Sequence, residues 1–221
     1  MIINCIATHN YSKKKNFDDY YKSNILTILN LIKFAEKRNI KIINFSTISI
    51  YNSSPKNQTE EDEIEIANNM LATTKYIGEK LLEISNIETI NLRLPGVLTQ
   101  NKIASRPWLR TVISAIKEKK KIKAFNLEKK FNSLIDTKEI QDFIVHVIQG
   151  KFISGNYNFM SNNPLKLERI LAIITKVMKS DSKVIDCGSR KTLFINNKKI
   201  FKKFKYKISS VEKIILRNLN D

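Results

Sequence analysis

Two side chains in the first half of the sequence have the types and the spacing that proton chemistry needs. Thr47 carries a hydroxyl at the end of a predicted strand, and Lys75 carries an amine on the helix that follows. Hydroxyl and amine groups take part in proton transfer when the protein holds them beside the reacting atoms. The pair therefore suits proton chemistry next to a cofactor.

The elements that must position this pair can be recognised from their periodicity. Residues 70–84 predict a helix, because apolar side chains recur one turn apart along it. A second line on the same helix is charged and consists of Lys75, Glu79 and Glu83. Residues 41–46 before the helix and 89–94 after it are short apolar runs, as expected for buried strands. The helix therefore lies between two strands.

The rest of the chain extends this alternation. Residues 2–7 predict a further buried strand, and residues 17–37 predict an amphipathic helix. Alternating strands and helices predict an α/β fold with a parallel sheet and crossover helices. After Gly96 the pattern loosens. The elements expected there are helices at 108–119, 137–149, 165–178 and 211–219, and short strands at 122–125, 131–135, 155–159 and 184–185.

Composition excludes several classes of protein. The net charge is +18, but only seven of the 39 basic residues are arginine. Arginine is the side chain that most often binds phosphates and base edges in nucleic-acid complexes, so nucleic acid is not expected as a partner. No apolar run approaches the ~20 residues of a membrane span, so no membrane partner is expected. Cys5 and Cys187 are too few for a disulfide framework and fit the cytoplasm. His9 and His146 have no cluster of ligands nearby in sequence, so no metal site is expected.

Several segments, taken in order, resemble the extended short-chain dehydrogenase/reductase family, which includes NAD-dependent nucleotide-sugar epimerases, dehydratases and reductases. Residues 4–7 resemble the fourth strand of that family, and residues 71–79 resemble its Tyr-x-x-x-Lys helix. The other similar segments are 21–27, 45–51, 92–97, 132–140 and 155–158. The resemblance implies an incomplete Rossmann-like, doubly wound parallel sheet with a smaller C-terminal substrate lobe. Residues 1–100 would form a partial dinucleotide-binding domain, and residues 101–221 a substrate-binding lobe with interleaved Rossmann elements.

The resemblance also implies roles for individual residues. Thr47 would hydrogen-bond the reacting oxygen, and Lys75 would lower the pKa of a catalytic tyrosine and hold the ribose of the cofactor. Ala7 and Asn24 would lie along the cofactor, and Pro95 near the nicotinamide. The implied cofactor is NAD or NADP. The implied substrate is a nucleotide sugar of surface polysaccharide synthesis.

Two features depart from the family pattern. The tyrosine position holds Leu71, which has no proton to exchange. A shifted register, Tyr76 to Lys80, fits Tyr-x-x-x-Lys but displaces Gly78 and Glu79, so it is rejected. None of the five glycines forms the Gly-x-x-Gly-x-x-Gly loop that holds a pyrophosphate. We therefore expect poor dinucleotide binding and impaired or lost activity.

The missing loop also suggests an N-terminally truncated family member, whose first strand would be an unpaired apolar edge. Either a partner subunit or a second copy covers that edge, or the chain is a fragment; a non-catalytic homologue that binds a nucleotide sugar or a partner is the alternative function. Simpler roles remain open for three site residues. Thr47 could merely end a strand, Lys75 could be a surface lysine paired with Glu79, and Asn24 could join a helix to a loop.

Overall fold

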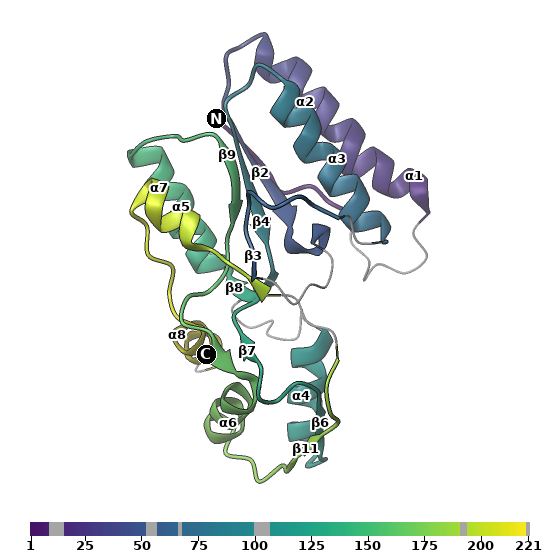
Figure 1. Cartoon of the computed structure of the whole chain (residues 1–221), viewed down its shortest axis with the longest axis vertical. Helices are drawn as coiled ribbons and strands as arrows, with labels where there is room; N and C mark the ends of the chain where they lie inside the picture. Colours follow the sequence, from purple (N-terminus) through teal and green to yellow (C-terminus); the bar gives the residue numbers. More distant parts are fainter. Residues whose placement is uncertain (9–15, 52–56, 66–67, 100–106, 191–193, 220–221) are drawn as a thin grey trace. The chain divides into compact units, whose positions relative to one another are not determined.

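The computed structural model describes residues 1–8, 16–51, 57–65, 68–99, 107–190 and 194–219 (Figure 1). The chain divides into two compact units, each assembled from three segments of the sequence. The first unit consists of Met1–Leu94, Val147–Phe159 and Leu193–Lys205, and the second of Pro95–His146, Met160–Thr192 and Tyr206–Asp221. The predicted functional division at residue 100 stays a prediction.

A four-stranded sheet forms the centre of the first unit. Its strands run in the order β1 (Ile2–Asn4), β2 (Ile42–Thr47), β4 (Thr89–Leu94) and β9 (Gly155–Asn158). All three strand pairs are parallel. The expected α/β fold with a parallel sheet is therefore confirmed, although β1 is shorter than the predicted strand at 2–7.

The helices of the first unit pack on this sheet. α1 (Phe17–Tyr20), a π-helical turn η1 (Tyr21–Leu26) and α2 (Thr27–Glu36) follow one another without a break, so the helix predicted at 17–37 is confirmed. α3 (Met70–Ile84) lies beside α2 in Figure 1. Ile28, Ala35, Ile42 and Leu82 form a buried cluster that joins both helices to the sheet.

Smaller elements complete the first unit. A 3-10 turn, η2 (Ile48–Ile50), follows β2. β3 (Asn57–Gln58) pairs in parallel with β12 (Phe194–Ile195), and α7 (Lys198–Phe204) comes next. The ring of Phe204 packs edge-on against Tyr157 of β9, which attaches α7 to the sheet. The sequence did not predict β3, β12 or α7.

The second unit contains three two-stranded sheets and four helices. β5 (Gly96–Leu98) pairs with β8 (Leu134–Asp136), and β6 (Ile122–Ala124) with β11 (Val184–Asp186), both in parallel. β7 (Lys130–Phe131) pairs with β10 (Leu165–Lys166) in antiparallel fashion. The helices are α4 (Pro107–Lys117), α5 (Thr137–Gln149), α6 (Leu167–Val177) and α8 (Val211–Leu219). The four helices predicted after Gly96 are confirmed.

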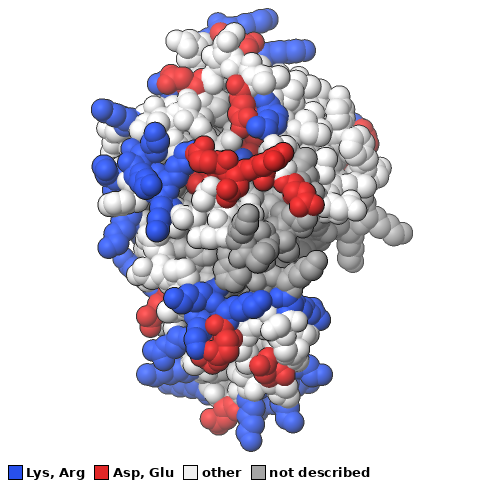
Figure 2. Space-filling model, viewed as in Figure 1, with Lys and Arg blue, Asp and Glu red and all other residues white. Residues whose placement is uncertain are grey.

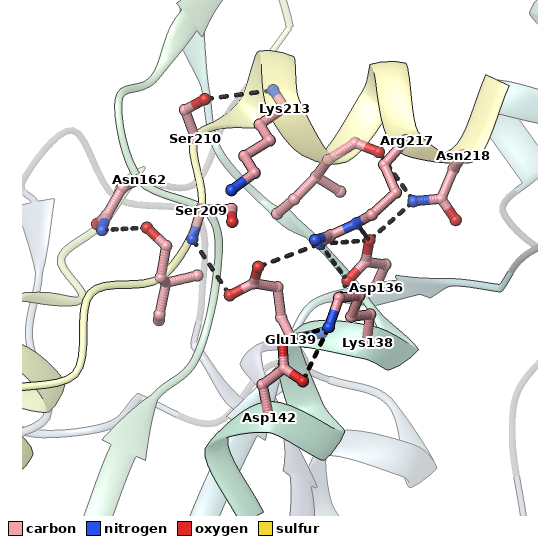
Figure 3. Close-up of polar contacts among 12 residues, drawn as sticks. Asp136, Lys138, Glu139, Asp142, Asn162, Ser209, Ser210, Lys213, Arg217 and Asn218 are labelled. Carbon is pink, nitrogen blue, oxygen red and sulfur yellow. Dashed lines mark hydrogen bonds and ion pairs between the residues drawn. The ribbon is translucent and has the colours of Figure 1, made fainter. Parts of the chain in front are cut away.

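A buried polar cluster attaches α8 to the start of α5 (Figure 3). Asp136 accepts the Glu139 backbone N–H at 2.9 Å, which caps α5. Arg217 of α8 donates to both carboxylates, at 2.8 Å from Asp136 and 3.1 Å from Glu139, and Asn218 donates to Asp136 at 2.8 Å. Because both acids are buried, these bonds supply the compensation that buried charges require. The cluster therefore has a structural role.

Surface charge is gathered by sign on the visible face. Figure 2 shows acidic side chains in a band near the middle, and basic side chains mainly along the left side and over the lower part. Several lysines form exposed ion pairs, including Lys80 with Glu83 and Lys138 with Asp142. Among the residues described, no helix has the length and apolar character needed to cross a membrane. That nucleic acid is not a partner stays a prediction.

Candidate functional site

The charged line of α3 faces the sheet and defines the site. Lys75, Glu79 and Glu83 follow one another at one-turn intervals, and Leu71 begins the same line. Asn69 caps the helix by accepting the Ala72 backbone N–H at 2.8 Å. Leu71, Lys75 and Glu79 are buried. This part of the line therefore forms the inner face of the helix.

Lys75 is fixed at the carboxyl ends of two strands. Its side chain is 5% exposed, and its Nζ donates to the carbonyl oxygens of Ile6 at 3.1 Å and of Phe45 at 2.8 Å. Burial lowers the pKa of Lys75 to about 8. Glu79 pairs with Arg93 instead, so the alternative of a surface Lys75–Glu79 pair is wrong. In open α/β sheets, ligands bind beyond the carboxyl ends of the strands, where Lys75 lies.

Two other predicted residues converge on the same edge of the sheet. Ala7 is exposed and lies next to Ile6, whose carbonyl holds Lys75. Asn24 is buried in η1 and accepts the Thr8 backbone N–H at 3.2 Å, which fixes the residue after Ala7. The structure therefore brings Ala7, Asn24 and Lys75 to one short segment after β1. The alternative that Asn24 joins a helix to a loop is confirmed as a contact, because its side chain ties η1 to Thr8 after β1.

Thr47 belongs to the same edge. It is the last residue of β2, two positions after the Phe45 carbonyl that holds Lys75. Its hydroxyl oxygen accepts the Ser49 backbone N–H at 3.1 Å and caps η2, so its orientation is fixed. Pro95 is buried between β4 and β5 and is the first residue of the second unit.

α3 and η1 approach each other closely at Gly78. A Cβ atom built there would lie 2.9 Å from the carbonyl oxygen of Asn24, closer than real contacts allow. The Asn24 side chain also donates to the Thr74 hydroxyl at 2.9 Å, next to Lys75 in sequence. Glycine at position 78 therefore lets Asn24 reach the helix that carries Lys75.

The position one turn before Lys75 is apolar and enclosed. Leu71 is 3% exposed and lies on the sheet-facing line. The shifted register from Tyr76 to Lys80, which was rejected from the sequence, lies on another part of the helix surface. Lys80 is half-exposed, lies over the ring of Tyr76 and pairs with Glu83. Tyr76 and Lys80 therefore belong to a different, more accessible line of α3.

Comparison with known proteins decides the family. The family model described as the NAD dependent epimerase/dehydratase family matches residues 1–158. The chain belongs to this family. A search of curated proteins gives no match.

Solved structures of the epimerase/dehydratase type share the fold. The UDP-glucuronic acid 4-epimerase of Bacillus cereus in complex with NAD superposes with a TM-score of 0.80 at 16% identity, covering 99% of this chain and 73% of that one. WbmG of Bordetella bronchiseptica in complex with NAD and UDP gives 0.82 at 16% identity, covering 99% and 71%. The UDP-N-acetylglucosamine 4-epimerase of Methanobrevibacter ruminantium M1, in complex with UDP-N-acetylmuramic acid, gives 0.75 at 21% identity, covering 91% and 69%.

The residues present fit only one end of the dinucleotide that the family implies. Lys75 uses two of its three N–H donors on carbonyls, which leaves one for a ribose hydroxyl. The five glycines lie within α3, at the starts of β5 and β9, directly after α5, and two residues after the end of β11, so none opens a helix after a strand as a pyrophosphate cradle does. Leu71 offers no proton.

Sequence reasoning missed the buried polar group beside Lys75. Arg93 of β4 donates to Glu79 through Nε and Nη2, at 2.8 Å for the shortest contact, and through Nη1 to the Tyr51 hydroxyl at 2.7 Å. Tyr51 donates onward to Asn158 at 2.9 Å. Burial raises the pKa of Tyr51 to about 12. A charged residue inside an otherwise apolar strand could have revealed this group. Among the described residues, no acidic, His and Cys cluster could hold a metal.

Proposed function

We propose that this chain is a homologue of nucleotide-sugar epimerases, dehydratases and reductases that works in the cytoplasm in surface polysaccharide synthesis. We further propose that, as it stands, it transfers hydride slowly or not at all. The observation that carries the second part is Leu71, buried one turn before Lys75 on the same line of α3. A hydrocarbon there can neither give nor take the proton that must accompany hydride transfer at a sugar carbon.

In this proposal the remaining site residues keep inherited places. Thr47 would hydrogen-bond the reacting oxygen, and Lys75 would hold the ribose. Ala7 and Asn24 would lie along the cofactor and Pro95 near the nicotinamide. The convergence of Ala7, Asn24 and Lys75 on one segment supports this arrangement. Similar structures contain NAD or NADPH, so they support a nicotinamide cofactor without choosing between NAD and NADP.

Calorimetry with the purified chain tests the proposal. We expect no saturable binding of NAD, NADH, NADP or NADPH at micromolar affinity and no turnover of UDP-glucuronic acid or UDP-N-acetylglucosamine, the sugar types named for similar structures. Saturable micromolar binding accompanied by turnover would contradict it. Binding without turnover would leave the catalytic part in place and refute only the expectation of poor cofactor affinity.

A second proposal is that the chain acts with a partner subunit. The observation that favours it is the exposure of β1 at the edge of the sheet, where Met1, Ile3 and Ile6 are large apolar side chains in contact with solvent. Natural proteins seldom leave such an edge uncovered. Size-exclusion chromatography with light scattering tests whether the chain alone is a monomer that awaits a partner or already forms an oligomer.

A further inference from the structure

Lys75 and Glu79 carry opposite charges one turn apart on the buried line of α3, yet they do not pair. A lysine and a glutamate at this spacing on a helix ordinarily attract each other. Both side chains are buried, at 5% and 0% exposure, where solvent screens charges least. The ammonium nevertheless bonds two backbone carbonyls, and the carboxylate pairs with Arg93 of β4. The structure therefore keeps two complementary charges apart.

Two side chains hold Arg93 in place. Its Nε and Nη2 groups donate to the Glu79 carboxylate at 3.1 and 2.8 Å, and its Nη1 group donates to the Tyr51 hydroxyl at 2.7 Å. Tyr51 donates in turn to Asn158 at 2.9 Å. A guanidinium stays charged, and its planar fork of donors fits a carboxylate better than an ammonium does. Arg93 is therefore a firmly placed partner for Glu79.

The course of α3 along the sheet decides what a bond between Lys75 and Glu79 would do. Lys75 contacts carbonyls at the carboxyl ends of the strands. Two turns further along the helix, Glu83 accepts from Asn156, the second residue of β9, near the amino ends of the strands. Glu79 lies between these two levels. Pairing with Glu79 would therefore draw the ammonium inwards, away from the edge where ligands bind in such sheets.

The donors of Lys75 lead to the same conclusion. Its ammonium has three N–H groups, and two of them bond the carbonyl oxygens of Ile6 at 3.1 Å and Phe45 at 2.8 Å. A carboxylate is a stronger acceptor for the remaining N–H than a sugar hydroxyl is, because the bond joins two charges. That N–H is available to a ligand only while Glu79 is bound elsewhere.

We infer that Arg93 is a positioning residue for Lys75: it occupies the Glu79 carboxylate and so keeps the ammonium at the carboxyl edge of the sheet, with one N–H left for a hydroxyl of the cofactor ribose. The inference rests on the proposed role of Lys75 in holding that ribose, and it names the residue on which that role depends. Arg93 acts through Glu79 and not through the two carbonyls that bond Lys75.

Removal of Arg93 leaves Glu79 as a buried carboxylate without its cation. Such a group either takes up a proton or finds another cation. Lys75 lies on the same line of α3, and the charge of Glu79 already acts on it. Uptake of a proton would leave Lys75 in place. Pairing would move the ammonium off its carbonyls and raise the pKa of Lys75 above about 8, the value to which burial lowers it.

Nuclear magnetic resonance of the full chain separates these two outcomes. With ¹³C in the lysine side chains, the Lys75 signal is identified by its loss in Lys75→Met, and titration gives its pKa. With ¹³C in the backbone carbonyls, the shifts of Ile6 and Phe45 report whether the ammonium still bonds them. Every variant carries Cys5→Ser, because the Cys5 thiol is the other titratable group whose charge acts on Lys75 among the residues described.

The variants form a cycle around Arg93 and Glu79. Arg93→Gln removes the charge and leaves an amide donor beside Glu79, and Glu79→Gln removes the competing carboxylate. We expect Arg93→Gln to raise the pKa of Lys75 by about one unit or more, a tenfold change in proton affinity, and to shift both carbonyl signals. In the double variant, the pKa of Lys75 should equal that in Glu79→Gln alone. Arg93→Lys keeps the charge but loses the fork, so it should give a smaller rise.

Two results would overturn the inference. An unchanged Lys75 pKa and unchanged carbonyl shifts in folded Arg93→Gln would mean that Glu79 takes up a proton instead. A rise that persists after Glu79→Gln is added would mean that Arg93 does not act through Glu79. If Arg93→Gln does not fold, Arg93→Lys takes its place in the cycle, and the absence of any rise there has the same meaning.

The measurement uses neither a nicotinamide nor a nucleotide sugar. Its failure would therefore leave the proposed loss of hydride transfer untouched. Turnover by the wild-type chain would refute that loss and would leave the measured position of Lys75 as it is.

Discussion

Restoring a phenol at position 71 is the sharpest test of the candidate site. Leu71→Tyr places a hydroxyl on the sheet-facing line of α3, one turn before Lys75. Leu71→Phe is the matched control, because it adds the same ring without the hydroxyl. Both rings overfill a buried position, at a cost of about 1–3 kcal/mol in folding stability, and this cost largely cancels between the two variants.

The size of the effect follows from the geometry of the helix. Four residues rise about 6 Å along an α-helix, so the phenol oxygen and the Lys75 ammonium lie on the order of 6 Å apart. At an effective dielectric constant of about 20, the phenolate gains roughly 3 kcal/mol from that charge. Taken alone, this charge lowers a phenol pKa by about two units, and it opposes the rise that burial causes, as burial does at Tyr51. The Lys75 pKa, itself about 8, keeps the ammonium charged below that pH.

Ultraviolet titration of phenolate absorbance measures this pKa without any need for activity. Subtracting the Leu71→Phe spectrum removes the seven native tyrosines. We expect the added tyrosine to titrate about two pH units lower beside Lys75 than after Lys75→Met is added. With cofactor and nucleotide sugar present, general acid–base catalysis predicts a gain of about 10²–10⁴-fold in turnover over the phenylalanine control. An added phenol whose pKa is the same with and without Lys75 would refute the assignment of position 71.

Three further predictions concern stability, measured by urea unfolding. Arg93→Met leaves a buried carboxylate unpaired and costs about 3–5 kcal/mol, whereas Lys80→Met in an exposed pair costs less than about 1 kcal/mol. The pKa of Lys75 is about 8 in the folded chain, below its ordinary value of 10.5, so the unfolded chain binds more protons between these two values. Wild-type stability should therefore rise relative to Lys75→Met from pH 8 to pH 10.5, by about 3 kcal/mol. Gly78→Ala forces a Cβ against the Asn24 carbonyl and costs about 1–3 kcal/mol, seen as a lower urea midpoint.

Each of these has a clear contrary result. Similar losses for Arg93→Met and Lys80→Met would mean that the buried pair does not carry the expected charge. If the difference in the free energy of unfolding between wild type and Lys75→Met does not change from pH 8 to pH 10.5, the Lys75 amine is solvated rather than buried. A neutral or stabilising Gly78→Ala would mean that η1 can move away from α3.

The sequence predicted the elements near Lys75 better than it predicted their contacts. The charged line of α3 was visible because helical periodicity is local. That it faces the sheet could not be inferred, because the groups that compensate it are distant in sequence. Arg93 satisfies Glu79, and two backbone carbonyls satisfy Lys75. A line of charged residues along a helix normally indicates a solvent-exposed face. Here the charges have buried partners, so the line can face the sheet.

A row of hydrogen-bonded asparagines also crosses the four-stranded sheet, and it could not be predicted for a related reason. Its members are Asn4, Asn44, Asn91 and Asn156. Its neighbours are separated by 40, 47 and 65 residues, and they meet only because the strands share one register. Very short strands such as β3 and β12 were missed as well, since two residues carry no periodicity. The segments that resembled the family were found because they depend on order along the chain, which the sequence contains directly.

The contacts of α3 also set an order for folding during synthesis. Lys75 binds the carbonyls of Ile6 and Phe45, which the ribosome releases before the helix. Glu79 needs Arg93, and Glu83 needs Asn156, which follows 63 residues later (156 − 93 = 63). At about 5–20 residues per second, that gap lasts roughly 3–13 seconds. The helix therefore gains these polar partners one turn at a time, in the direction of translation, and Glu83 lacks its Asn156 partner until β9 has been made.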